Sequence, residues 1–264
     1  MYSENELKYF LDEQYRLYNR PAFIDVDPIS IPHAFTQKED IEIAGLFAAT
    51  MAWGNRKAIL ANGQKLMALM DHQPYNFVMH ATARDMQVFK KFVHRTFQSD
   101  DVVFFIRGIR HIYKTRGSLE AAFFVPHAPT IKQGIVQFRT CMLSVSHAAR
   151  SRKHLSDPDN GSAAKRLCMY LRWMVRKDPS KVDFGIWETL LPSQLCMPLD
   201  VHTGRVSRAL GILKRKQNDW RAVEELTAVL RALDAKDPIK YDIAIFGMGV
   251  ETKPIKLVLA QPSS

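Results

Sequence analysis

Two residues of the chain have the types and positions that covalent chemistry needs. Lys165 falls in the first turn of an expected helix, just after the predicted N-cap Ser162. The helix dipole is positive at this end, which favours the neutral, nucleophilic form of a lysine amine. Asp200 is the expected N-cap of a later helix, where a carboxylate satisfies backbone N–H groups and stays ionised. Such a pair could form and stabilise a covalent intermediate; the structural alternative is a surface lysine and a simple helix cap.

The segment around Asp200 carries a recognisable motif. The run from Leu199 to Gly211, Leu-Asp-Val-His-Thr-Gly-Arg-Val-Ser-Arg-Ala-Leu-Gly, resembles the Val-Asp-Thr-His-Val-x-Arg-Val-x-x-Arg-Leu-Gly signature of helix-hairpin-helix DNA glycosylases. In that superfamily the aspartate is catalytic, and a lysine on an upstream helix is the nucleophile of the bifunctional members. The resemblance therefore implies a catalytic role for Asp200.

A second run supports the lysine. Lys-Arg-Leu-Cys-Met-Tyr-Leu-Arg, from Lys165 to Arg172, is similar to the lysine-containing helix of archaeal-type 8-oxoguanine DNA glycosylases. Most of the chain also resembles an uncharacterised bacterial family, a domain of unknown function placed in the same superfamily. These likenesses imply that Lys165 attacks the sugar C1′ of a flipped nucleotide and that Asp200 stabilises the positive charge that develops there.

The sequence departs from the glycosylase pattern at the hairpin. The usual hairpin reads Leu-Pro-Gly-x-Gly, with the lysine two residues after the second glycine. This chain has Asp-Asn-Gly-Ser at positions 159–162, and Lys165 lies four residues after Gly161. Gly161 and Ser162 are therefore expected to bind the DNA backbone through an atypical hairpin. The four-cysteine iron–sulfur loop of some relatives is absent, and no cofactor is expected.

Further DNA contacts are expected beside the two catalytic candidates. Arg172 and Arg176 share a helical face with Lys165 and could form a basic stripe along phosphates; the alternative is that they are solvated or ion-paired. His202 and Arg205 match the signature and either contact the DNA backbone or hold their helix. Asp237 is the expected N-cap of a late helix, and the archaeal-type enzymes have a comparable acidic residue late in the chain. By similarity to those enzymes, the terminal residues Lys253 and Lys256 could help to recognise the base.

The segment Trp53-Gly54-Asn55-Arg56 lies at an expected junction between two helices. In the superfamily the equivalent junction supplies residues that fill the gap left by the flipped base. Trp53 could stack on a base, and Asn55 or Arg56 could enter the duplex. The alternative is a buried tryptophan followed by an asparagine cap.

Helical periodicity runs through nearly the whole chain, and strand-like alternation is scarce. The expected fold is all-α, a two-lobed helical bundle resembling helix-hairpin-helix glycosylases. It forms a single domain over 1–264, with a turn-rich break at 157–161 and the catalytic helices at about 161–213. The expected helices run from Leu7 to Tyr18, from the Thr36–Glu39 capping box to Gly54, from Asn55 to about Met70, and over about 84–94, 100–115, 129–147, 162–176, 201–213, 219–233 and 238–248.

Composition narrows the class of partner. The 264 residues include 37 Lys and Arg against 27 Asp and Glu, which gives a net charge of +10 and favours nucleic acid before an anionic membrane. No signal peptide and no apolar run of membrane-spanning length are found, so a cytoplasmic, nucleoid-associated protein that is a monomer is expected. Three scattered cysteines and nine histidines show no metal-ligand spacing, so no metal site is expected.

These inferences converge on a DNA repair glycosylase, with or without AP-lyase activity, that excises a damaged base such as an oxidised purine from double-stranded DNA. Two alternatives stay open. The same fold could bind DNA lesions or structures without cleaving them. The chain could also be a helical protein–protein interaction module whose basic surface binds an acidic partner.

Overall fold

The chain is all-α, as expected, in a computed structural model that describes residues 3–250. A single two-stranded hairpin, β1 (Val93–His94) paired with β2 (Phe97–Gln98), is the β structure of these residues. The α-helices are α1 (Glu4–Tyr18), α2 (Lys38–Met51), α3 (Arg56–Ala68), α4 (Pro74–His80), α5 (Ser99–Arg116), α6 (Leu119–Phe123), α7 (Lys132–Leu143), α8 (Lys165–Val175), α9 (Val201–Ala209), α10 (Trp220–Leu233) and α11 (Tyr241–Val250). Short 3₁₀ helices are η1 (Pro21–Val26), η2 (Pro28–Ser30), η3 (Pro32–Ala34), η4 (Asp85–Phe89), η5 (Ala149–His154), η6 (Pro192–Gln194) and η7 (Pro238–Lys240).

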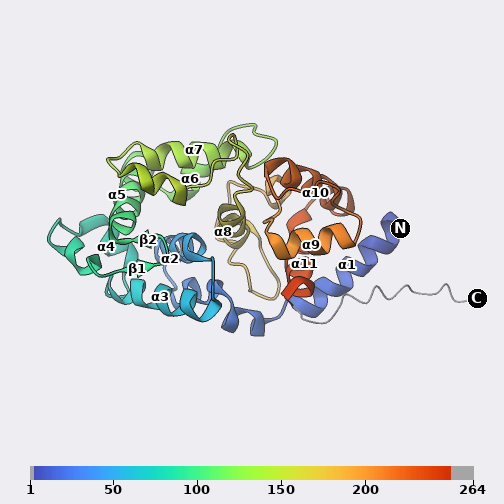
Figure 1. Cartoon of the computed structure of the whole chain (residues 1–264), viewed down its shortest axis with the longest axis horizontal. Helices are drawn as coiled ribbons and strands as arrows, with labels where there is room; N and C mark the ends of the chain where they lie inside the picture. Colours follow the sequence, from blue (N-terminus) through green and yellow to red (C-terminus); the bar gives the residue numbers. More distant parts are fainter. Residues whose placement is uncertain (1–2, 251–264) are drawn as a thin grey trace, which may run out of the picture.

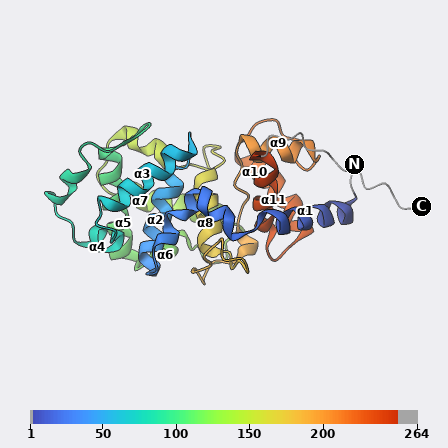
Figure 2. The same cartoon turned by 90° about the horizontal axis from the view of Figure 1, so that it is seen from below.

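The helices form two groups that lie on opposite sides of α8 (Figures 1 and 2). One group holds α2 to α7, and the other holds α1, α9, α10 and α11. Helix α1 packs against α11, so the first and the last described helices belong to the same group. The segment from η1 to η3 connects α1 back to α2. Helix α8 therefore contacts elements that come from both ends of the sequence.

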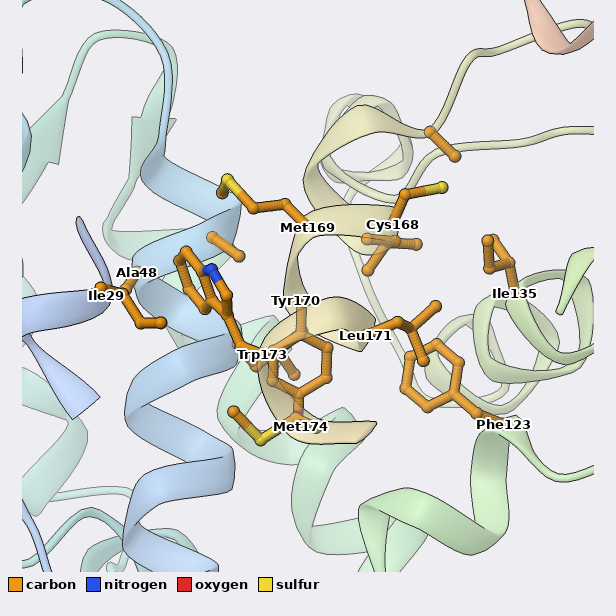
Figure 3. Close-up of a cluster of buried hydrophobic side chains, with 14 of the residues drawn as sticks. Ile29, Ala48, Phe123, Ile135, Cys168, Met169, Tyr170, Leu171, Trp173 and Met174 are labelled. Carbon is orange, nitrogen blue, oxygen red and sulfur yellow. The ribbon is translucent and has the colours of Figure 1, made fainter. Parts of the chain in front are cut away.

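Helix α8 is the central core helix, because every residue from Leu167 to Val175 is buried. Figure 3 shows Met169 and Trp173 on the side of α2, whereas Leu171 lies toward Phe123 of α6. Helix α2 approaches closely at Gly45, where an added Cβ would lie 3.1 Å from the Met174 methyl carbon. Burial of each large apolar side chain contributes about 1.5–3 kcal/mol, so this core fixes the position of the first turn of α8.

The helices around the candidate site differ from the expectation mainly at their ends. Helix α8 begins at Lys165 rather than at 162, because Ala164 adopts a left-handed conformation with φ 47° and interrupts the helix. Ser162 is therefore not its N-cap and instead forms an isolated bridge with Asp219. Asp200 caps α9 as predicted, and Gly211 follows the end of that helix with φ 76°.

The helix expected over 84–94 is wrong. That region is η4 followed by the hairpin β1–β2, whose side chains alternate between exposed and buried. Buried Met86, Phe89 and Phe92 follow one another at intervals of three residues, a spacing that a helical pattern also has, which is why periodicity alone misassigns the segment. Helices α4 and α6 were not expected, and both are short. No helix within residues 3–250 is long and apolar enough to cross a bilayer.

Candidate active site

A pocket of about 470 Å³ opens where α8 and α9 begin. Its wall is built from both helix groups, since η1 and the α2–α3 junction contribute from one side and α9 and α11 from the other. Lys165 and Asp200 both line it, although they lie far apart in the sequence. The other lining residues are Phe23, Asp27, Pro28, Ala52, Trp53, Gly54, Arg56, Ile59, Arg166, Met169, Arg172, Val201, His202, Asp242, Phe246 and Val250.

The two catalytic candidates face one another across this pocket. Lys165 Nζ lies 3.8 Å from Asp200 Oδ2, and each side chain keeps about a quarter of its surface exposed. The same Nζ is 3.3 Å from the Met169 sulfur and 5.9 Å from the centre of the Phe246 ring. An ion pair this accessible contributes little to stability, on the order of 0–1 kcal/mol. The lysine is thus held close to a carboxylate while remaining open to a ligand.

The Asp200 carboxylate divides its two oxygens between structure and the pocket. Oδ1 accepts hydrogen bonds from the backbone N–H groups of His202 at 2.8 Å and Thr203 at 3.0 Å. Thr203 Oγ1 in turn accepts from the Asp200 N–H at 2.8 Å, which completes a capping box. The cap fixes the carboxylate plane and leaves Oδ2 as the oxygen directed at Lys165. The N-cap role and the catalytic role expected from the sequence are therefore geometrically compatible.

Two further carboxyl groups line the pocket, Asp27 and Asp242. Both are buried, at 6% and 4% exposed. Burial raises the pKa of Asp27, although its Oδ1 accepts a hydrogen bond from the Ile29 N–H at 3.0 Å. Burial also raises the pKa of Asp242 to about 6, against the opposing effect of the Arg172 guanidinium. The sequence drew attention to the segment that contains Asp242 but not to Asp27, which sits in an irregular Pro-rich stretch with no periodicity to mark it.

The predicted phosphate contacts of Arg172 and Arg176 are wrong, because both side chains are buried, at 3% and 1% exposed. Arg172 Nε lies 3.1 Å from Asp183, and its Nη1 pairs with Asp242. Arg176 Nη1 lies 2.6 Å from Asp183, and its Nε lies 2.8 Å from Asp237. Burial opposes both charges, but these carboxylates outweigh it and raise the pKa of each guanidinium. The two arginines join α8 to its neighbours and offer no basic stripe to DNA.

In the loop before α8, two backbone N–H groups donate to carbonyl oxygens of the same loop. The Gly161 N–H donates to the Pro158 carbonyl at 3.0 Å, and the Ser162 N–H donates to the Asp157 carbonyl at 3.0 Å. The Gly161 carbonyl accepts from the Trp220 N–H, which ties the loop to the start of α10. The amides of Gly161 and Ser162 are thus already paired, unlike the free donors that phosphate binding by backbone requires.

The α2–α3 junction presents one cation to the pocket. Trp53 is half-buried, with the Arg166 guanidinium 5.0 Å from its ring centre and the His94 ring edge-on at 5.1 Å. Asn55 caps α3 by accepting a hydrogen bond from the Ala58 N–H at 3.2 Å. Its side chain therefore serves as a helix cap, which was the structural alternative to insertion into DNA. Arg56 is exposed and lines the pocket.

His202 and Arg205 hold the end of α11 against α9. Arg205 Nη2 donates to the Gly249 carbonyl at 2.8 Å, and the His202 ring lies 3.3 Å from the same oxygen. Both side chains belong to exposed residues, and His202 also lines the pocket. Lys253 and Lys256 lie outside the described residues.

One family model matches the chain over residues 27–251, and it is described as a protein of unknown function (DUF2400). The chain belongs to this family. No curated protein and no solved structure matches it. The expectation of an uncharacterised family is confirmed, and the family description names no activity. The matched range contains every pocket residue except Phe23.

The pocket of this DUF2400 protein combines a primary amine, a carboxyl group beside it and two buried carboxyl groups. Within residues 3–250 no three or more His, Cys, Asp or Glu side chains are grouped as metal ligands would be. The arrangement suits attack by an amine on an electrophilic carbon, with a carboxylate close enough to accept a proton or to stabilise positive charge.

Proposed function

We propose that this protein is a DNA glycosylase that excises a damaged base through a covalent bond to Lys165. The observation that carries the proposal is the 3.8 Å approach of Lys165 Nζ to Asp200 Oδ2 in an open pocket of about 470 Å³. Pockets of about 300–1,000 Å³ are typical of small-ligand sites, a range that accommodates an extrahelical nucleobase. The net charge of +10 and the glycosylase-like motif at Asp200 support a DNA substrate.

The chemistry proceeds by displacement at the sugar. The Lys165 nitrogen forms a bond to C1′ while the C1′–N glycosidic bond breaks, and the electron pair of that bond leaves with the base, which takes up a proton. Loss of the amine protons and opening of the sugar ring at O4′ then give an imine. In the lyase branch, removal of a C2′ proton expels the 3′ phosphate as the leaving group.

Asp200 acts on this centre through its free oxygen. Oδ2 accepts a proton from the attacking amine and stabilises the positive charge that develops at C1′. Because Oδ1 is held by the helix cap, the carboxylate needs no rearrangement during the step. Phe23 and Phe246, packed edge to face with ring centres 6.4 Å apart, give the pocket an aromatic wall suited to a flat base.

Borohydride trapping tests the proposal directly. Duplexes with 8-oxoguanine, uracil, an alkylated base or an abasic site are incubated with the protein and then reduced. We expect a covalent protein–DNA complex with at least one of them, and its loss in Lys165→Ala. Lys114→Ala is the matched control, because Lys114 is an exposed lysine in the last turn of α5, outside the pocket lining.

The outcomes separate the competing functions. A trapped complex that survives in Lys165→Ala would assign the nucleophile elsewhere. No trapping and no base release from any duplex would refute the enzyme, and retained tight binding to damaged DNA would then favour a non-catalytic lesion binder. Absence of DNA binding altogether would leave a helical protein–protein interaction module.

A further inference from the structure

The hairpin β1–β2 places an arginine beside the pocket mouth. His94 pairs with Phe97, so Arg95 and Thr96 form a two-residue loop. Arg95 is exposed and has φ 54°, a left-handed conformation that disfavours side chains other than glycine by roughly 1–2 kcal/mol. Such strain persists only where the surrounding structure enforces it, and it is often found at functional sites.

The body of the hairpin is held firmly. His94 and Phe97 are both buried, at 2% and 0% exposed. The His94 ring packs edge-on against Trp53 at 5.1 Å, and the Phe97 ring packs edge-on against Phe105 at 5.3 Å. Arg150 Nη2 donates to the Thr96 carbonyl at 3.1 Å, which fixes the loop itself. Arg95 is therefore carried on a rigid support.

The side chain of Arg95 crosses the glycine of the α2–α3 junction. A Cβ built on Gly54 would lie 2.6 Å from Arg95 Nη1 and 3.1 Å from Arg95 Cδ. Gly54 has φ 102° and lines the pocket. The guanidinium thus reaches the pocket rim through space that any other residue at position 54 would fill.

Arg95 and Arg56 are both exposed at this rim, and within residues 3–250 neither guanidinium forms an ion pair or a hydrogen bond. Arg166, the third guanidinium nearby, already donates to the Thr50 carbonyl at 2.7 Å and covers Trp53. Unpaired guanidiniums on a rigid surface suit an anionic partner that arrives from solution, and a phosphate accepts two N–H groups of arginine at once.

We infer that Arg95 is a phosphate-binding residue that grips the DNA backbone next to the nucleotide held in the pocket. The inference rests on the proposed DNA substrate and adds a residue that no sequence motif indicated. The hairpin sets the direction of the guanidinium, Gly54 makes room for it, and the pocket beside it fixes which phosphate it meets. Arg95 is a positioning residue, since it touches no reacting atom.

The test measures DNA binding without chemistry. The probe is a duplex with one tetrahydrofuran abasic analogue, which cannot form an imine, and its Kd is measured over a series of salt concentrations. We expect Arg95→Gln to weaken binding about three- to tenfold and to reduce the slope of log Kd against log salt by about 0.9, the value of one phosphate contact. Arg95→Lys should keep the slope, because the charge remains.

Arg116→Gln is the matched control. Arg116 is an exposed arginine at the far end of the 18-residue helix α5, on the order of 25 Å from the hairpin at about 1.5 Å per residue, and should bind as wild type. An unchanged Kd and slope in Arg95→Gln would overturn the inference. The inference would also be overturned if Arg95→Gln weakened binding to the abasic duplex but not to an undamaged duplex, with an unchanged slope. That pattern would indicate that Arg95 inserts between bases. Borohydride trapping is measured separately from DNA binding. The proposed enzyme activity can therefore be refuted while phosphate binding by Arg95 is supported, and phosphate binding can be refuted while the activity is supported.

Discussion

At the scale of single residues, the structural role of Asp200 as the cap of α9 and its proposed role in base release can be separated by substitution. Asparagine is as good an N-cap as aspartate, since its side-chain oxygen can still accept from the N–H groups of His202 and Thr203. It lacks the charge that faces Lys165. The variant Asp200→Asn therefore isolates the electrostatic contribution from the structural one.

We expect Asp200→Asn to slow base release about 100- to 1,000-fold, the cost of losing one stabilising group at a developing charge. Its Tm should stay close to that of wild type. Asp200→Ala should lose the cap as well and be destabilised by about 1 kcal/mol. Single-turnover base release and thermal unfolding on the same preparations check both parts. Wild-type base release by Asp200→Asn would show that the carboxylate serves only as a cap.

At the scale of elements, the hairpin β1–β2 is less stable with an arginine at its tip than it would be with a glycine there. In a two-residue loop, positive φ at the first central position is where glycine is normally found. Arg95 occupies this position with φ 54°, whereas Thr96 has negative φ. Replacing an exposed residue there by glycine relieves the backbone and removes no buried surface.

Arg95→Gly should therefore stabilise the protein by about 0.5–1 kcal/mol, which raises the Tm by about 2 °C in a chain of this size. The same variant should lose the phosphate contact and bind DNA as weakly as Arg95→Gln. Arg95→Ala serves as the reference, because it removes the guanidinium and keeps the backbone conflict. If Arg95→Gly and Arg95→Ala unfold at the same temperature, the strain is not stored at this residue.

Prediction from sequence succeeded at several local signals, although the capping box expected at Thr36–Glu39 does not form: Gln37 is the N-cap of α2 and makes no side-chain cap hydrogen bond. The caps at Asn55 and Asp200, and the glycine breaks at Gly54 and Gly211, depend on residues within one turn, and all four lie where the pattern placed them. The start of α8 was misplaced, because the bridge between Ser162 and Asp219 is a contact between distant segments. Periodicity describes a segment on its own and carries no information about such partners.

The site shows the same limit. Lys165 and Asp200 were singled out by motif, and the structure brings them together. Arg172 was predicted to lie on a basic surface. Its acidic partners, Asp183 and Asp242, come from other parts of the chain, so the spacing within α8 gave no sign of them. Helical spacing reveals which residues share a face but not whether that face meets solvent or a carboxylate.

At the scale of the whole molecule, a buried network of ion pairs connects α8 to the two segments beside it. Asp242 of α11 pairs with Arg172 of α8, which also pairs with Asp183 in the loop after α8. Asp242 borders the pocket, so the contact that joins the helix groups also shapes the site. Removing the Asp242 charge eliminates one ion pair but leaves Arg172 paired with Asp183, so no unpaired charge is left in the interior.

This network makes stability depend on pH in a direction that can be stated. Burial raises the pKa of Asp242 to about 6 in the fold, above the ordinary value of about 3.9 in an unfolded chain. The folded state thus holds the proton more tightly, so the stabilising contribution is fully present at low pH. It is lost as the pH rises from about 4 through about 6.

Between about pH 4.5 and about pH 7 the free energy of unfolding of wild type should fall by about 2 kcal/mol relative to that of Asp242→Asn, which has no proton to lose. Denaturant unfolding of both proteins at the two pH values measures the difference. Asp12→Asn is the control: burial opposes ionisation there, but Lys8 and Lys240 lower the pKa of Asp12, so its difference from wild type should stay nearly flat over the same range. A difference between wild type and Asp242→Asn that does not change with pH would mean that Asp242 is ionised throughout, and that its pair with Arg172 outweighs the burial of its charge.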